Sequence, residues 1–271
     1  MKRSILFILS TFLVCTSYAQ NGTSQIGARP AGMAYTYATI SDKWAMFNNP
    51  GGLGGLNETS VMASFENKFG IDGFNSVGAA FLTSWSLGSI GASAYRFGDD
   101  LYNEQTISLA YGNKFGIAGL GVKVNYLQYT VKEFGSKGVI TIDFGGTAEI
   151  TEYIRFGAYI RNIGQAKVAE LNDERVPTLL NAGLAFLPSK KLTLAIEAEK
   201  DIDNEALFRA GLEYKFLEKF AVRTGIKTQK FTNYFGLGFI SQKLNIDYAL
   251  TYDQVLGLSH QAALSYTFKK K

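Results

Sequence analysis

Hydrophobic and polar residues alternate with a period of two along most of the chain. In one clear stretch, Ile140, Ile142 and Phe144 would lie on one side of an extended backbone. Thr141 and Asp143 would lie on the other side. The same alternation runs through residues 192–199, 208–216, 220–227, 244–252 and 258–268. A period of two is typical of β-strands with one apolar and one polar face, so the pattern predicts an all-β protein.

Turn signals divide the chain into fourteen such runs. Their centres lie near Ala63, Gly78, Ala92, Leu109, Val124, Phe144, Ala158, Gly183, Leu194, Leu212, Thr224, Leu237, Ile246 and Leu264. The spacing suits tilted strands that cross a bilayer in roughly 9–11 residues, with short connections. Single-chain outer-membrane barrels also have an even number of strands. We therefore predict a transmembrane antiparallel β-barrel of about 14 strands, with a soluble β-sandwich as the alternative.

The composition agrees with strands that are rich in aromatic residues and interrupted by glycines. Hydrophobic residues make up 46% of the chain, aromatic residues 14% and charged residues 18%. The charged fraction is below the roughly 25% of an average soluble protein. Several aromatic residues fall near predicted strand ends, where a membrane barrel carries aromatic girdles. They are Tyr153, Tyr159, Phe186, Phe216, Phe220, Tyr248, Tyr252, Tyr266 and Phe268.

The sequence offers few residues for enzymatic or metal chemistry. Cys15 is the single cysteine and His260 the single histidine. This excludes a disulfide framework, cysteine-based zinc sites and two-histidine metal motifs. We predict no enzyme, no catalytic residue, no metal and no cofactor. Asp99 and Asp100 could bind calcium, but an exposed turn is the stronger interpretation. His260 could belong to a catalytic triad, but a structural histidine is the stronger interpretation.

The formal net charge of +4 is concentrated at the two ends of the chain. Two basic residues, Lys2 and Arg3, lie at the start, and three lysines end the chain at Lys271. The rest of the chain is nearly neutral. No basic face is left that could follow a phosphate backbone, so the sequence indicates no nucleic-acid partner.

The first 19 residues have the features of an export signal. Two basic residues precede a short apolar core at residues 5–14, and small residues lead to a cleavage point after Ala19. This pattern predicts a signal peptide over residues 1–19. An uncleaved anchor helix and lipidation at Cys15 are the alternatives. Because no later segment resembles a membrane helix, a membrane-inserted chain would need a closed barrel.

Charged residues recur on the polar strand faces, which a membrane barrel turns toward its lumen. The predicted lumen charge network consists of Asp143, Glu197, Arg209, Glu213, Arg223, Lys227 and Asp247. A tight turn would set Glu213 opposite Arg223, and Arg209 opposite Lys227. The preceding hairpin would set Glu197 beside Arg209, as cross-strand ion pairs. Such pairs either satisfy a narrow interior or line a substrate path, and both interpretations stay open.

The segment from Gly27 to Leu53 is rich in small residues and lacks alternation, so it should not form a strand. Its motif consists of Gly27, Arg29, Gly32, Asp42, Trp44, Phe47, Asn49, Pro50 and Gly51. Later elements include Arg161-Asn162-Ile163-Gly164, Val176-Pro177, Arg223-Thr224-Gly225 and Asp247-Tyr248-Ala249. In this order, the elements closely resemble the PorV/PorQ family of exported Bacteroidetes-type proteins. The resemblance covers essentially the whole mature chain.

This resemblance implies a FadL-like barrel of fourteen strands with an inward-folded N-terminal plug. Residues 20–57 would form the plug and residues 58–271 the barrel. The implied role is non-enzymatic, in the outer membrane of a Gram-negative bacterium, and associated with type IX protein secretion or surface assembly. The implied partners are outer-membrane lipid and either secretion components or exported proteins. A periplasmic turn without a plugging role is the alternative for the N-terminal segment.

A FadL-like transporter of hydrophobic small molecules is the alternative function. The predicted loops at 97–103, 165–177 and 201–205 are short, which weighs against holding an exported protein. The charged inner faces weigh against a wide apolar channel with a hydrophobic ligand. An outer-membrane hydrolase is a third reading, for which the sequence offers no catalytic constellation.

Overall fold

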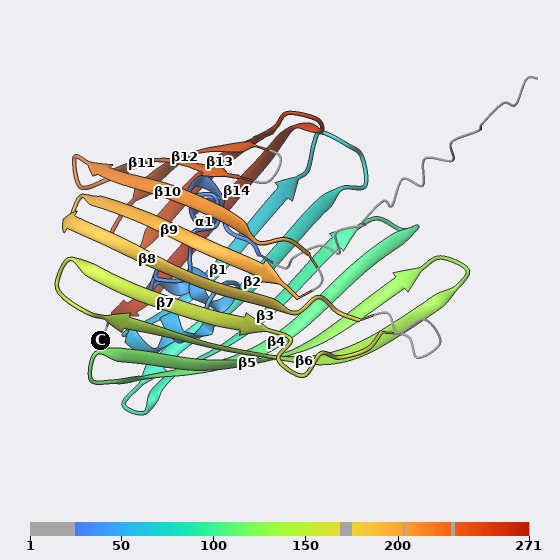
Figure 1. Ribbon diagram of the computed structural model, residues 1–271, viewed down its shortest axis with the longest axis horizontal. Coiled ribbons are helices and arrows are strands. Elements are labelled where there is room, and N and C mark those ends of the chain that lie inside the picture. The colour runs from blue at the N-terminus through green and yellow to red at the C-terminus, as the bar shows by residue number, and fades with distance from the viewer. Residues whose placement is uncertain (1–24, 169–174, 203, 229–230, 271) are drawn as a thin grey trace, which may run out of the picture.

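Fourteen antiparallel strands form one closed barrel in the computed structural model of the chain (Figure 1). The structure describes residues 25–168, 175–202, 204–228 and 231–270. The predicted signal peptide, residues 1–19, and the alternative lipidation site Cys15 lie outside the described residues. Each strand pairs with its neighbours in the sequence, and the last strand pairs with the first. The predicted barrel of fourteen strands is confirmed, and the alternative of a two-sheet sandwich is wrong.

From residue 25 onward, three short helical elements precede the barrel. They are α1 (Ala28–Gly32) and the 3-10 helices η1 (Lys43–Met46) and η2 (Pro50–Gly55). The strands are β1 (Glu58–Asn67), β2 (Asn75–Trp85), β3 (Gly88–Gly98), β4 (Tyr102–Phe115), β5 (Ala118–Val131), β6 (Gly135–Glu149), β7 (Ile154–Arg161), β8 (Leu179–Ser189), β9 (Leu192–Asp201), β10 (Leu207–Phe216), β11 (Phe220–Lys227), β12 (Thr232–Ile240), β13 (Leu244–Asp253) and β14 (Gly257–Lys270). All fourteen predicted centres fall inside these strands.

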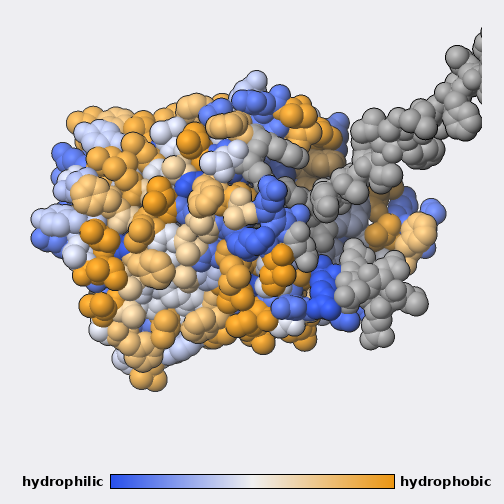
Figure 2. All heavy atoms as spheres, in the orientation of Figure 1, coloured by the Kyte–Doolittle hydropathy of each residue, from blue (hydrophilic) through white to orange (hydrophobic). Residues whose placement is uncertain are grey.

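Burial alternates along the strands as the sequence predicted. On β4, Ile107 and Leu109 are 62% and 61% exposed, whereas Ser108 between them is 5% exposed. Because successive side chains of a strand point to opposite faces, the apolar faces line the outside of the barrel. Hydrophobic residues cover much of the visible side wall (Figure 2). No helix in the described part of the chain is long and apolar enough to span a bilayer.

Tyr159 differs from the other aromatic residues predicted near strand ends. It is 3% exposed and lies inside the barrel, whereas the others are exposed or half-buried. On β7 it alternates with the buried Gly157 and Arg161, so it shares their inner face. The girdle prediction is wrong for Tyr159 because its position in the strand, not its aromatic ring, determines which way it points.

The segment that precedes the barrel lies inside it (Figure 1). α1 contacts β12 and β13, and η2 contacts β4, β5 and β6. Large side chains of this segment, such as Met33, Trp44 and Leu53, are almost completely buried. No part of residues 27–53 forms a strand, as the missing alternation predicted.

The strands differ in length around the barrel. β4, β5 and β6 have 14, 14 and 15 residues, while β7 and β11 have 8 each. The β5–β6 hairpin therefore extends beyond its neighbours (Figure 1). Short turns, such as residues 190–191 between β8 and β9, connect the strands at the opposite end, where the C-terminus lies.

Candidate functional site

The candidate functional site is the barrel interior, where the wall meets the N-terminal segment. The interior has a charged side, built by β9 to β13, and an apolar side, built mainly by β1 to β4. These two linings differ in what they can bind.

Arg29 of α1 joins the N-terminal segment to the charged side. Its Nε and Nη2 donate to Glu213 on β10 at 2.9 and 2.8 Å, and its Nη1 donates to Asp42. Arg223 on β11 donates to the same Glu213 at 2.6 Å and to Asp247 on β13 at 2.7 Å. The Glu213 side chain is completely buried. One buried carboxylate thus accepts hydrogen bonds from two arginines, one from the segment and one from the wall.

A second charged cluster surrounds Arg209 on β10. Its Nη2 donates to Glu199 at 2.9 Å, and its Nη1 lies 3.8 Å from Glu197. Glu197 accepts the backbone N–H of Ala38 at 2.7 Å and the hydroxyl of Tyr159 at 3.2 Å. This cluster therefore also contacts the N-terminal segment, through a backbone group.

Asp143 lies in a third cluster, on β6. Its carboxylate is 3.1 Å from the Nζ of Lys123 and accepts the backbone N–H of Asn162 at 3.0 Å. Lys227 lies opposite Arg209 at the end of β11. The predicted network is thus divided among separate clusters. Asp143 lies apart from the other predicted residues, Glu197 lies with Arg209, and Glu213 lies with Arg223 and Asp247.

The predicted cross-strand register is confirmed. Glu213 pairs with Arg223, while Arg209 pairs with both Lys227 and Glu197. Lys123 and Tyr37 are among the interior residues that were not predicted. Lys123 lies between Val122 and Val124 on β5, so the alternation itself was the signal that could have found it. Tyr37, whose hydroxyl donates to Asp42 at 2.6 Å, lies in the irregular segment and carries no such signal.

The apolar side is centred on Trp44 and Phe47 of the predicted motif. Their ring centroids are 6.2 Å apart, and both side chains are buried. They belong to a cluster that also includes Met62, Leu82 and Tyr95 of the wall. These side chains form a packed nonpolar cluster between the segment and strands β1 to β3, and buried polar residues such as Ser76 and Ser93 share the inner faces of these strands.

The Asn-Pro-Gly motif fixes the segment to the wall. The Oδ1 of Asn49 accepts the backbone N–H of Gly51 at 2.9 Å. The Nδ2 of Asn49 donates to the carbonyls of Ala38 at 2.5 Å and Gly146 at 3.0 Å. Pro50 begins η2, where its missing N–H costs no helical hydrogen bond. Asn49 thereby satisfies backbone groups of the segment and of β6 together.

Glycines on both surfaces allow a close approach. Gly27 has a φ of 119°, and a Cβ there would lie 2.7 Å from the Trp44 ring. A Cβ on Gly32 would lie 2.9 Å from the Cα of Gly236 on β12. A Cβ on Gly225 of β11 would lie 2.8 Å from Ala34. Since such distances leave no room for a side chain, the segment and wall are fitted to each other.

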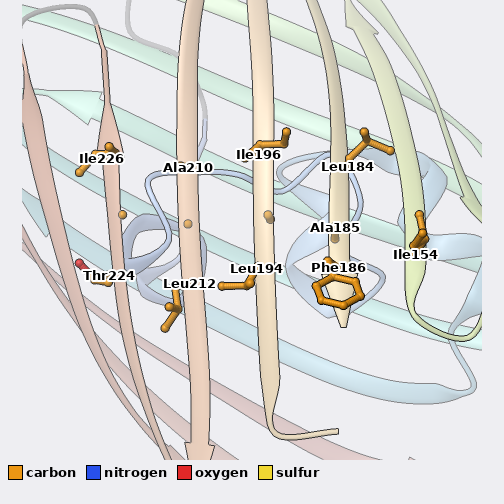
Figure 3. A pocket seen from close by; sticks show the side chains of 13 residues that line it. Ile154, Leu184, Ala185, Phe186, Leu194, Ile196, Ala210, Leu212, Thr224 and Ile226 are labelled. Atoms are coloured by element: carbon orange, nitrogen blue, oxygen red, sulfur yellow. The ribbon is translucent and has the colours of Figure 1, made fainter. Parts of the chain in front are cut away.

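A groove of about 620 Å³ lies on the outer wall rather than in the interior (Figure 3). The side chains that line it come from β7 to β11 and are almost all apolar. Ile226, the small Ala210, Ile196 and Leu184 lie in a row across β11, β10, β9 and β8 (Figure 3). The groove belongs to the apolar outer surface.

The weaker candidates for chemistry have structural explanations. Asp99 Oδ1 accepts the backbone N–H groups of Tyr102 and Leu101 at 3.0 and 2.8 Å, which lowers the pKa of the Asp99 carboxyl and forms a turn. His260 faces outward, with its Nδ1 2.6 Å from the hydroxyl of Tyr248. In the described ranges, no group of three or more histidine, cysteine or acidic side chains is placed to hold a metal ion.

Solved transporters and channels share this fold. The toluene transporter TbuX of Ralstonia pickettii has a TM-score of 0.69 and 13% sequence identity, over 92% of this chain and 99% of that one. The monoaromatic hydrocarbon channel TodX, as a deltaS2 mutant, has a TM-score of 0.71 and 11% identity, over 92% of this chain and 100% of that one. A FadL homologue of Pseudomonas aeruginosa has a TM-score of 0.63 and 11% identity, with the same coverage.

These likenesses establish the fold as a FadL-like barrel, as the family resemblance implied. No protein-family model and no curated protein sequence matches the chain. The resemblance to the PorV/PorQ family therefore rests on the motif residues alone. Structures with this fold include transporters and channels.

Proposed function

We propose that this chain is an outer-membrane barrel through which small hydrophobic molecules pass. The observation that carries the proposal is the apolar interior side around Trp44 and Phe47. It occurs in a fold shared with a toluene transporter and a monoaromatic hydrocarbon channel. Binding sites for small molecules are mostly apolar with a few placed polar groups, and this side of the interior has that character.

The apolar outer wall supports placement in a membrane. Exposed patches of this extent are rare on soluble monomers, whereas lipid-facing strands require them. We propose that residues 1–19 are removed as a signal peptide during export. In outer-membrane barrels the short turns face the periplasm and the longer loops face outward. The β5–β6 hairpin would then project from the cell.

We propose that residues 20–57 act as the plug and residues 58–271 as the barrel. Arg29 and Asn49 bind this segment to the charged side and to β6. On the other side, the segment packs around Trp44 against the wall, and its Lys43 lies 3.4 Å from Glu58 at the start of β1. A hydrophobic molecule would therefore cross between the segment and strands β1 to β3, where Trp44 and Phe47 offer nonpolar contacts.

Binding to this side is tested by the fluorescence of Trp44, with toluene as the probe. The chain has two tryptophans, and Trp85 lies 38% exposed on the outer wall. In a Trp85→Phe variant, toluene should change the Trp44 emission saturably, whereas charged benzoate should not. The matched Trp44→Phe variant should show no saturable change. Equal, non-saturable changes in both variants would contradict the proposed site.

Transport is tested in cells that lack this protein, complemented with the full chain. Toluene uptake through the outer membrane should fall in the deletion strain and recover on complementation. Uptake that is the same in all three strains would refute the transport role while leaving the membrane placement intact.

A role in type IX secretion is a second candidate, of the kind the PorV/PorQ resemblance implies. It is favoured by the fixed attachment of the segment, because Arg29 and Asn49 of the shared motif both make polar contacts with the wall. The partners would be secretion components or exported proteins. Profiling surface proteins in the same deletion strain separates the two candidates. Lost surface proteins with normal toluene uptake would favour secretion.

A further inference from the structure

Strand β6 is much longer than its neighbour β7, with 15 residues against 8. It pairs with β5 from Gly135 to Ala148, but with β7 only from Phe144 to Glu149. No described residue pairs with the β7 side of β6 between residues 135 and 141. One edge of the projecting hairpin is therefore open among the residues that the structure describes.

The chain leaves β6 because of Asn162, which follows β7. Asn162 has a φ of 51° and turns the backbone away. Its side chain donates to the carbonyl of Val176 at 2.7 Å, and Asp143 accepts its backbone N–H. The final backbone bond on this side runs from the N–H of Ile163 to the carbonyl of Ile142 at 2.9 Å.

This final bond identifies which backbone groups lie at the open edge. The carbonyl of Ile142 points toward β7, and the N–H and C=O of alternate residues in a strand point the same way. Ser136, Gly138 and Ile140 therefore direct their N–H and C=O groups to the open edge. The odd-numbered residues between them bond to β5.

We propose that this edge of β6 binds an extended polypeptide segment by strand addition. A row of N–H and C=O groups at strand spacing is complementary to another extended backbone. The edge has two glycines and no proline between residues 135 and 141, so neither bulk nor a missing N–H blocks it. Residues 135–138 are exposed on both faces of the hairpin.

The length of β6 places this edge in water. A tilted strand crosses a bilayer in roughly 9–11 residues, and β6 has 15. Counted from Glu149, the residues around Gly138 lie beyond the hydrocarbon, where an open edge is tolerated. Only the location outside the cell rests on the proposed membrane orientation; the edge itself does not.

A second copy of the chain in the same membrane does not fit this edge. Two barrels inserted the same way are related by rotation about the membrane normal, so their β6 strands run in the same direction. A two-fold pairing of identical strands has to be antiparallel. Lipid has no row of N–H and C=O groups at strand spacing. A separate polypeptide is free to run in the required direction.

Residue-resolved amide hydrogen exchange of the mature protein in detergent tests the edge directly. In the free protein, the amides of Gly138 and Ile140 should exchange quickly, while those of Lys137 and Val139, bonded to β5, should exchange slowly. Slow exchange at Gly138 and Ile140 would mean that another part of this chain occupies the edge. The proposal would then be wrong.

The probe is a soluble peptide with seven alternating threonine and valine residues. Added at ten times its dissociation constant, it should slow exchange at Gly138 and Ile140 about tenfold and leave Lys137 unchanged. The same peptide with N-methyl groups along its bonding edge should have no effect. No protection by the unmodified peptide at millimolar concentration overturns the proposal.

An Ile140→Pro variant removes one edge N–H without touching the ladder to β5, since proline is tolerated at open edges. It should lose the peptide effect at Gly138. The control, Ile140→Val, keeps the N–H and should retain it. Heat-modifiable gel migration checks that both variants fold. Toluene binding should be the same in both, so failure of this proposal is distinguishable from failure of the transport role.

Discussion

Glu213 occupies the point where the wall and the N-terminal segment meet. Its carboxylate is fully buried and accepts hydrogen bonds from Arg29 and Arg223. A buried ion pair adds little net stability compared with well-packed apolar residues, because both charges lose their hydration. Breaking such a pair is costly, because a buried charge is left without its partner. Glu213 therefore determines where the segment attaches more than it stabilises the barrel.

Replacing Glu213 with glutamine should lower the free energy of unfolding by about 3–5 kcal/mol, the usual cost of leaving buried charges unpaired. Urea titration of the refolded protein measures this loss. Asp100→Asn is the control, because Asp100 is 99% exposed and lies 3.7 Å from Arg96. Exposed pairs contribute about 0–1 kcal/mol. Equal losses in both variants would mean that the cluster around Glu213 is open to water.

Exchanging the charges at 213 and 223 should not restore stability, although these residues face each other in the register. An arginine introduced at 213 would meet Arg29, and a glutamate introduced at 223 would meet Asp247. The double variant Glu213→Arg, Arg223→Glu should therefore be at least as unstable as Glu213→Gln in the same titration. Recovery to the wild-type midpoint would show that Arg29 does not reach position 213.

Gly225 faces Ala34 across the narrow gap between wall and segment. A Cβ there would lie 2.8 Å from Ala34, so Gly225→Val should cost about 1–3 kcal/mol by overpacking. Gly146→Ala is the control on a strand, because its Cβ would meet the far end of the Leu120 side chain at 3.2 Å and the carbonyl of Gly119 at an ordinary 3.5 Å. Thermal unfolding of both variants provides the measurement. An unchanged midpoint for Gly225→Val would indicate that the segment does not press against β11.

At the scale of elements, the strands were predictable and the packing of the N-terminal segment was not. The alternation located all fourteen strands, and a tight turn determined the pairing of β10 with β11. The bond between Arg29 and Glu213 joins residues 184 positions apart, and no local pattern encodes such a contact. The motif indicated which residues of the segment are special, but not which wall residues they bind.

η2 depends on Asn49, which bonds to the segment and to β6. Asn49→Ala would leave the buried carbonyl of Ala38 without this donor, and an unsatisfied buried group costs about 1–3 kcal/mol. We expect a lower midpoint in urea and faster proteolysis of the N-terminal segment. Asn113→Ala is the control, because its side chain bonds only to the neighbouring Lys114 backbone among the hydrogen bonds described, near the end of β4. Equal proteolysis in both variants would contradict the role of Asn49.

At the scale of the whole molecule, the interior is divided between two functions. The charged side attaches the segment through Arg29, and the apolar side packs against it around Trp44. Polar contacts of the segment also reach β14, where Lys43 donates to Thr267 at 2.8 Å, and β1, where Lys43 lies 3.4 Å from Glu58. A molecule that passes the segment near Trp44 would meet the nonpolar cluster. The closed ring of strands forms the outer wall, and its backbone pairing does not depend on which residues line the interior.

Removing residues 25–56 tests whether the segment closes the barrel. The fourteen strands should still form a ring, because each strand bonds only to its neighbours. Unchanged heat-modifiable migration on gels would verify this ring. The emptied lumen, with charged residues such as Asp143, Glu213 and Arg223 on its wall, should then conduct small ions in planar bilayers. The intact protein should be nearly silent, because the segment fills the interior. The same low conductance with and without the segment would mean that residues 20–57 do not act as a plug, and passage would then have to be blocked by the wall side chains themselves.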